Sequence, residues 1–105
     1  MVIEFDKGYL SELYYEGKAS DKKHRFQPQI VKRYKRVVDI LMVADRVEDL
    51  FLINSLNYEK LSGDKAAIES VRVNDQYRIE FVSRTEGEET LITICKLLEL
   101  SNHYK

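Results

Sequence analysis

The sequence predicts an α+β protein in which two helices pack on one face of a small sheet. Apolar residues recur at three and four positions from residue 30 to 42, which is typical of an amphipathic helix. Alternating and continuous apolar runs between residues 70 and 100 indicate strands. Because one short strand and two helices precede these strands, we expect a helical layer on one side of the sheet.

One hydrophobic core is expected for the whole chain, residues 1–105, as a single domain. The chain has 105 residues and 44% hydrophobic composition, enough for one core and too little for two. Aromatic residues are plentiful and no repeat or low-complexity run is present, so we expect no long disordered region. No apolar stretch reaches the roughly 18 residues that cross a bilayer, and no signal peptide is recognisable. We therefore expect a cytoplasmic protein without a membrane contact.

The first half of the chain is expected to supply one strand and two helices. Residues Val2–Phe5 form the strand, and an apolar-rich stretch over residues 9–15 forms the first helix. After a polar loop, Pro28 suits the first turn of the second helix. The apolar stripe of that helix consists of Ile30, Val31, Tyr34, Val37, Val38, Leu41 and Met42.

Residues 70–81, with the sequence SVRVNDQYRIEF, predict a β-hairpin that presents two arginines. Side chains alternate across a strand, so the apolar residues of each run share one face. Val71 must pair with Ile79, because a one-residue slip would turn one apolar set outward. The same register places Arg72 directly across from Arg78, on the opposite face.

Two arginines that face each other repel, which favours an anion between or above them. Arginine is the usual residue where a planar fork holds phosphate or carboxylate oxygens through two parallel hydrogen bonds. The residues alone leave a second interpretation open, in which both arginines are solvated surface residues balanced by Glu69 or Glu80.

The last apolar run, residues 90–100, is apolar on both faces and predicts a central strand covered on each side. A polar, turn-like stretch over residues 85–89 precedes it. Cys95, the only cysteine, lies within this run and is expected to be a small buried side chain. With one cysteine we expect neither an internal disulfide nor a thiol-ligated zinc site.

Positive charge is concentrated between residues 18 and 36, although the whole chain has a net charge of −1. This segment contains eight Lys or Arg residues and one acid. Such a cluster attracts phosphate backbones, and it is equally consistent with a solvated helix face and loop. Lys22, Lys23 and Arg25, in the loop, are candidates for substrate binding.

Three segments of the C-terminal half resemble one protein family. They are residues 61–64 (LSGD), the hairpin and residues 99–105 (ELSNHYK). Together they are similar to HigB toxins of the RelE/ParE superfamily of bacterial toxin-antitoxin systems. The resemblance extends from about residue 56 to the end, and the first half shares only the order of its elements. It implies a RelE-like, microbial-ribonuclease-like fold with a small antiparallel sheet.

The resemblance also implies an activity: an endoribonuclease that cuts messenger RNA, generally on the ribosome, and so inhibits translation. In that reaction the ribose 2′-hydroxyl attacks the adjacent phosphate and the 5′-oxygen leaves, without a metal or another cofactor. The family match assigns phosphate and transition-state stabilisation to Arg78 with Arg72, and proton transfer to His103. Tyr104 is expected to hold single-stranded RNA by stacking on a base.

The chain departs from the family pattern at several positions. Family members often have a histidine or lysine just before and within the Leu-x-Gly-Asp segment, where this chain has Glu59, Lys60 and Ser62. Lys60 is therefore a candidate catalytic cation, and Glu59 is a candidate substrate-binding residue or base, with a plain surface location as the alternative. Residues 65–69 lack the usual glycine and aromatic residue, and Ser101 and Asn102 replace an acid and an aromatic residue.

Two other functions remain compatible with this fold. One is a ParE-like inhibitor of DNA gyrase without enzymatic activity, and the other is a degenerate protein that only binds an antitoxin. The combination of Arg72, Arg78 and His103 favours cleavage, since the ParE branch usually lacks the catalytic residues. The resemblance further implies a cognate helix-turn-helix antitoxin, similar to HigA. We expect contact with DNA only through that antitoxin.

Overall fold

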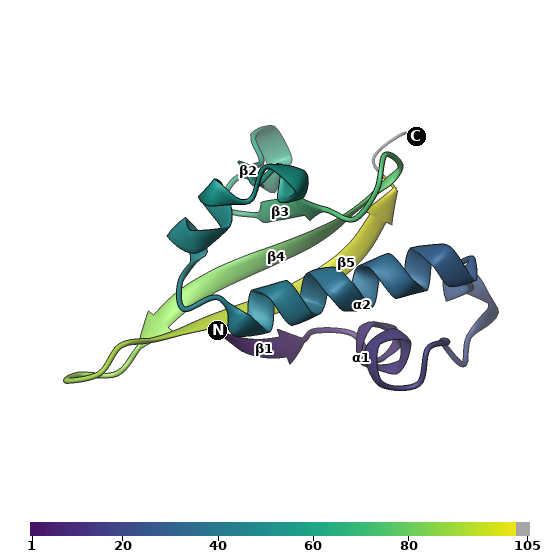
Figure 1. Ribbon diagram of the computed structural model, residues 1–105, viewed down its shortest axis with the longest axis horizontal. Coiled ribbons are helices and arrows are strands. Elements are labelled where there is room, and N and C mark those ends of the chain that lie inside the picture. Colours follow the sequence, from purple (N-terminus) through teal and green to yellow (C-terminus); the bar gives the residue numbers. More distant parts are fainter. Residues whose placement is uncertain (103–105) are drawn as a thin grey trace.

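The computed structural model of the protein describes residues 1–102, in which two helices lie over one face of a five-stranded sheet (Figure 1). The strand order across the sheet is β1-β5-β4-β3-β2. The strands are β1 (Val2–Phe5), β2 (Glu59–Lys60), β3 (Glu69–Arg72), β4 (Tyr77–Glu86) and β5 (Ile92–Asn102). The helices are α1 (Gly8–Tyr15) and α2 (Pro28–Val43), and four short 3-10 turns are η1 (Lys22–His24), η2 (Val47–Leu52), η3 (Asn54–Leu56) and η4 (Gly63–Lys65).

The predicted α+β class is confirmed, with one difference in the sheet. We expected an antiparallel sheet, whereas β1 pairs with β5 in parallel, from Val2 opposite Ile94 to Phe5 opposite Leu97. The remaining strand pairs are antiparallel. Antiparallel neighbours can be joined by a tight turn, but β1 and β5 are separated by most of the chain. No turn therefore fixes their relative direction, and the sheet is mixed.

Helix α2 begins at Pro28, as the sequence predicts, and runs to Val43. Its buried side chains are Ile30, Val31, Tyr34, Val37, Val38 and Leu41. Proline is tolerated in the first turn because its missing N–H would have no partner within the helix there. The hydroxyl of the fully buried Tyr34 donates to the Leu10 carbonyl oxygen of α1 over 2.7 Å. This bond joins the two helices.

The core lies between the helices and the sheet. The side chains that the strands and the β3–β4 turn contribute to it are Val71, Val73, Ile79, Phe81, Cys95, Leu97 and Leu100. Cys95 is fully buried, as predicted, and burial raises the pKa of its thiol to about 12. Within residues 1–102, no helix combines the length and apolar character that a bilayer crossing requires.

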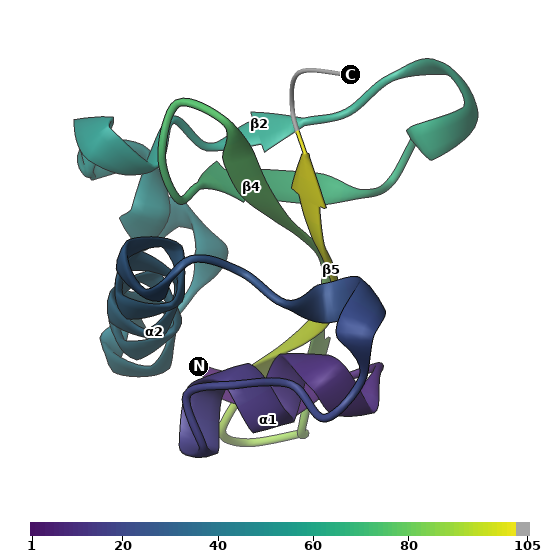
Figure 2. The same ribbon diagram turned by 90° about the vertical axis from the view of Figure 1, so that its right-hand side faces the viewer.

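Three features assemble at one end of the molecule: the connection between α1 and α2, the turn between β3 and β4, and the end of β5 (Figures 1 and 2). Two contacts hold α2 and the connection that precedes it against the hairpin. The guanidinium Nε of Arg33 on α2 donates to the Val73 carbonyl oxygen over 3.0 Å. The rings of Phe26 and Tyr77 meet edge to face, with centroids 5.3 Å apart. The loop that carries Lys22, Lys23 and Arg25, called the basic loop below, is thereby anchored against the hairpin.

Candidate active site

The β3–β4 hairpin has the predicted register. Arg72 is paired with Arg78, and Val71 with Ile79. The side-chain oxygen of Asn74 accepts hydrogen bonds from the backbone N–H groups of residues 76 and 77, at 2.9 and 2.7 Å. An asparagine that bonds to the backbone two residues ahead closes a tight turn. This local bond holds the two strands in the register that brings the arginines together.

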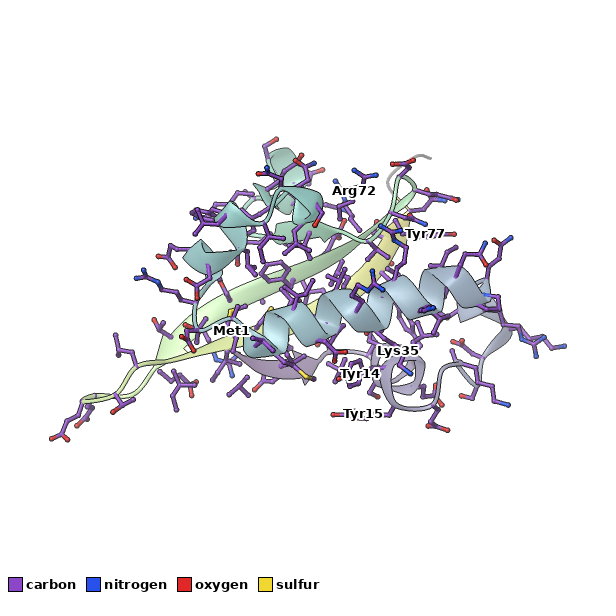
Figure 3. All side chains as sticks on the ribbon, viewed as in Figure 1. Met1, Tyr14, Tyr15, Lys35, Arg72 and Tyr77 are labelled. Carbon is purple, nitrogen blue, oxygen red and sulfur yellow. The ribbon has the colours of Figure 1, made fainter. Side chains whose placement is uncertain are left out.

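Both arginines line one cavity of about 150 Å³. The other lining residues are Asn57, Glu59, Ser70, Asn74, Asp75 and Tyr77. Arg72 and Tyr77 project at the same end of the molecule in Figure 3. The lining is largely polar, and it combines two guanidinium groups with amide, hydroxyl and carboxylate groups. A cavity of this composition suits an anionic ligand with several oxygen atoms.

The two arginines differ in their exposure and in their carboxylate partners. The Arg72 side chain is 46% exposed and forms an ion pair with Asp75 in the turn. The Arg78 side chain is only 20% exposed, and its terminal nitrogen Nη2 lies 3.3 Å from a carboxylate oxygen of Glu80. An interaction with an anion is stronger where less water competes. Arg78 is therefore the better placed of the two to stabilise a developing charge.

Glu80 contacts Arg78 beside this cavity and was not among the site residues predicted from the sequence. Its side chain is 4% exposed, and the ε-amino group of Lys65 in η4 donates to both of its oxygens, at 2.9 and 3.2 Å. The interpretation in which acids balance the arginines is thus realised for Arg78 and Glu80. Glu69 has other partners, because it accepts hydrogen bonds from the hydroxyls of Tyr58 and Ser83.

The structure brings some predicted residues into the cavity and leaves others outside it. Glu59 lines the cavity together with the two arginines. Lys60 lines a different cavity of about 260 Å³, which also contains Glu69 and Arg84. This separation follows from the strand alternation, which turns neighbouring side chains of β2 to opposite faces. His103 and Tyr104 lie outside the described residues.

The basic loop has an organisation that the sequence did not indicate. Lys22, Lys23 and Arg25 are exposed. Between them, the Nδ1 atom of His24 lies 2.8 Å from an Asp21 carboxylate oxygen, and this hydrogen bond lowers the pKa of Asp21. The His24 ring is stacked on Tyr9, with centroids 3.6 Å apart. The loop is therefore fixed to α1.

The hydroxyl of Tyr9 in turn accepts a hydrogen bond from the backbone N–H of Leu100, which connects α1 to the end of β5. Burial raises the pKa of Tyr9 to about 12. The only sequence signal for the Asp21–His24 contact in the loop was the Asp-x-x-His spacing of these two residues.

In residues 1–102, no three His, Cys, Asp or Glu side chains are arranged to hold a metal ion.

Comparisons with known proteins identify the family. Residues 3–92 match a family model described as the RelE-like toxin of the type II toxin-antitoxin system HigB. Toxin HigB-1 of Vibrio cholerae is 33% identical over 82 residues, which cover 77% of this chain and 82% of that protein. A YoeB/ParE toxin from Agrobacterium tumefaciens has a similar fold, with a TM-score of 0.59 and 17% identity over 99% of this chain and 100% of that chain. The chain therefore belongs to the HigB-like, RelE-type toxins of type II toxin-antitoxin systems.

Proposed function

We propose that this toxin is a metal-independent endoribonuclease that cleaves messenger RNA on the ribosome and so stops translation in the cytoplasm. The observation that carries the proposal is the placement of Arg72 and Arg78 directly opposite each other, lining one polar cavity with Glu59. Two guanidinium groups in such a cavity can bind the scissile phosphate and stabilise the additional charge of its transition state.

Each step of the cleavage has a candidate group. The carboxylate of Glu59 accepts the proton of the ribose 2′-hydroxyl, whose oxygen then attacks the adjacent phosphorus. The bond from phosphorus to the 5′-oxygen breaks, which leaves a 2′,3′-cyclic phosphate, and His103 donates a proton to the departing oxygen. Arg78, with Arg72, neutralises the phosphate charge throughout. Lys60 stays a candidate cation, although it lines the other cavity.

The basic loop supports binding of a long anionic substrate. Its exposed cations Lys22, Lys23 and Arg25 precede Phe26, which contacts the cavity residue Tyr77. Phosphates that flank the cleaved position can therefore pair with these cations. Tyr104 follows the candidate acid in the sequence and stacks on a base in this proposal. The partner that restrains the toxin is a cognate HigA-like helix-turn-helix antitoxin, through which the pair contacts DNA.

The test is induced expression of the wild type and of Arg78→Ala, with primer-extension mapping of message ends. We expect growth arrest and new 5′ ends for the wild type, and a loss of both for the variant. Arg84→Ala is the matched control, because Arg84 lies on the same strand and pairs instead with Glu4 and Glu86. Growth arrest with intact messages, together with inhibition of purified gyrase, would overturn the ribonuclease proposal in favour of a ParE-like function.

A further inference from the structure

The carboxylate of Glu80 joins two cations at the edge of the candidate site. One of its oxygens lies 2.9 Å from the ε-amino group of Lys65 and 3.3 Å from the terminal nitrogen Nη2 of Arg78. The side chain of Glu80 is 4% exposed, whereas that of Lys65 is 46% exposed. A nearly buried anion with two cationic partners has little freedom to move, so it is a fixed reference point for both of them.

Lys65 and Glu80 belong to different elements of the fold. Lys65 ends η4, the turn after β2, and Glu80 lies in the middle of β4, directly opposite Ser70 of β3. The ion pair therefore connects η4 to the strand that carries Arg78. Since Arg78 and Glu80 are two residues apart on one strand, their side chains share a face, and the carboxylate can hold the guanidinium group from one side.

We propose that Glu80 is a positioning residue that orients the guanidinium group of Arg78 toward the cavity and holds Lys65 beside it as a third cation for RNA phosphate. This inference rests on the proposed function. Lys65 supplies here the charge that the sequence suggested for Lys60. A misplacement of about 1 Å in a group that stabilises the transition state can reduce the rate by about 100-fold, so orientation has a measurable value.

The central experiment compares the wild type with Glu80→Gln, which keeps the size of the side chain and removes its charge. We expect kcat for RNA cleavage to fall by about 10- to 100-fold. We expect the affinity for an uncleavable 2′-deoxy oligonucleotide to stay within about threefold of the wild type, because the cations remain near the phosphate. The thermal unfolding midpoint, measured by circular dichroism, shows whether each variant is folded at the assay temperature.

Glu99→Gln is the matched control. Glu99 lies directly across from Glu80 on β5, so the variant removes the same charge from the adjacent position and leaves the Lys65 and Arg78 contacts intact. Its kcat should stay within about twofold of the wild type. In an Arg78→Ala background, measured in single turnover at high protein concentration, Glu80→Gln should cause little further loss, because a positioning residue acts through its partner.

Lys65→Ala tests the second half of the inference. It should weaken binding of the 2′-deoxy oligonucleotide and reduce the slope of log affinity against log salt by about 1, the signature of one lost phosphate contact. Lys7→Ala, which removes an exposed lysine just before α1, should leave the slope unchanged. An unchanged slope for Lys65→Ala would remove Lys65 from the phosphate site.

Failure of this inference is distinct from failure of the proposed function. If the wild type cleaves RNA and folded Glu80→Gln has wild-type or higher kcat, the carboxylate only neutralises the cations and the positioning role is wrong. If the wild type does not cleave RNA, the proposed function is lost, and the phosphate-site inference is judged by oligonucleotide binding. In that case, equal salt slopes for the wild type and Lys65→Ala would overturn it as well.

Discussion

The rings of Phe26 and Tyr77 meet almost at right angles, with an interplanar angle of 86° and centroids 5.3 Å apart. Phe26 lies between the basic loop and α2, and Tyr77 begins β4 and lines the cavity that contains both hairpin arginines. The contact thus joins two segments that are far apart in the sequence and that both carry candidate RNA-binding cations. The contact therefore holds the basic loop and the hairpin in a fixed position relative to each other.

Phe26→Ala should therefore affect stability and RNA affinity together. Loss of a half-buried aromatic side chain and its edge-to-face contact should lower the free energy of unfolding by about 2 kcal/mol. RNA affinity should fall by about 3- to 10-fold, because the loop cations lose their fixed position. Urea unfolding and fluorescence anisotropy measure the two effects. Phe51→Ala, at a 55% exposed ring that packs on Tyr58, should leave RNA affinity unchanged.

Ala67→Gly should stabilise the protein. Ala67 has a backbone φ of +75°, in the left-handed region that a Cβ atom disfavours and glycine adopts readily. Relief of this strain exceeds the extra entropy of glycine in the unfolded chain, and we expect a gain of about 0.5–1 kcal/mol. Ala66→Gly is the matched comparison, because Ala66 has an ordinary φ of −56° and should lose stability. Equal shifts in the urea midpoint for both variants would contradict the argument.

Asp75→Asn should increase the affinity for RNA. Asp75 is 88% exposed and forms an ion pair with Arg72, so its carboxylate competes with a phosphate for the same guanidinium group. Removal of this competitor should tighten binding of a 2′-deoxy oligonucleotide by about two- to threefold at low salt, with a smaller effect at high salt. Asp45→Asn removes an exposed acid just after α2 and controls for net charge. An equal gain in both variants would mean that only net charge matters.

Stability should fall at alkaline pH, in part through Cys95. Burial raises the pKa of its thiol to about 12, from an ordinary value of 9.0. Above pH 9 the unfolded chain loses this proton while the folded protein keeps it, so the unfolded state binds fewer protons and unfolding becomes more favourable. Each such group contributes about 1.4 kcal/mol per pH unit once its unfolded form is ionised. The loss continues until the folded thiol also ionises.

Cys95→Ala tests this assignment. Between pH 9 and 10, its free energy of unfolding in urea should decline less steeply than that of the wild type, whatever the difference in absolute stability. Above pH 10, Tyr9 should add to the decline in both proteins, because burial raises its pKa from 10.0 to about 12. Parallel curves between pH 9 and 10 would assign the alkaline loss to other groups.

The hairpin and α2 could be predicted from sequence because each depends on a local rule. Strand alternation and the pairing of apolar faces fix Val71 opposite Ile79, and the two arginines then have one possible arrangement. For α2, an apolar stripe with Pro28 at its start leaves little freedom in where the helix begins. Strand pairing also explains the position of Glu59. Glu59 of β2 is paired with Ser70 of β3, and both residues line the cavity.

Features that depend on contacts between distant segments could not be predicted. The parallel pairing of β1 with β5 joins strands that are separated by most of the chain, and no local pattern encodes it. Glu80 has the polarity and parity of a solvated side chain, yet it is nearly buried and pairs with Lys65 of a different element, η4. Arg33 lies off the apolar stripe of α2, yet its guanidinium group bonds to the Val73 carbonyl oxygen of the hairpin.

The interior position of β5 affects when the sheet can form during synthesis of the chain. This strand lies between β1 and β4, although it is translated after both. Until it leaves the ribosomal exit tunnel, the N-terminal strand has no neighbour in the sheet, and the hairpin that carries the two arginines has no link to it. The five-stranded sheet therefore cannot be completed before β5 has been synthesised and has left the tunnel.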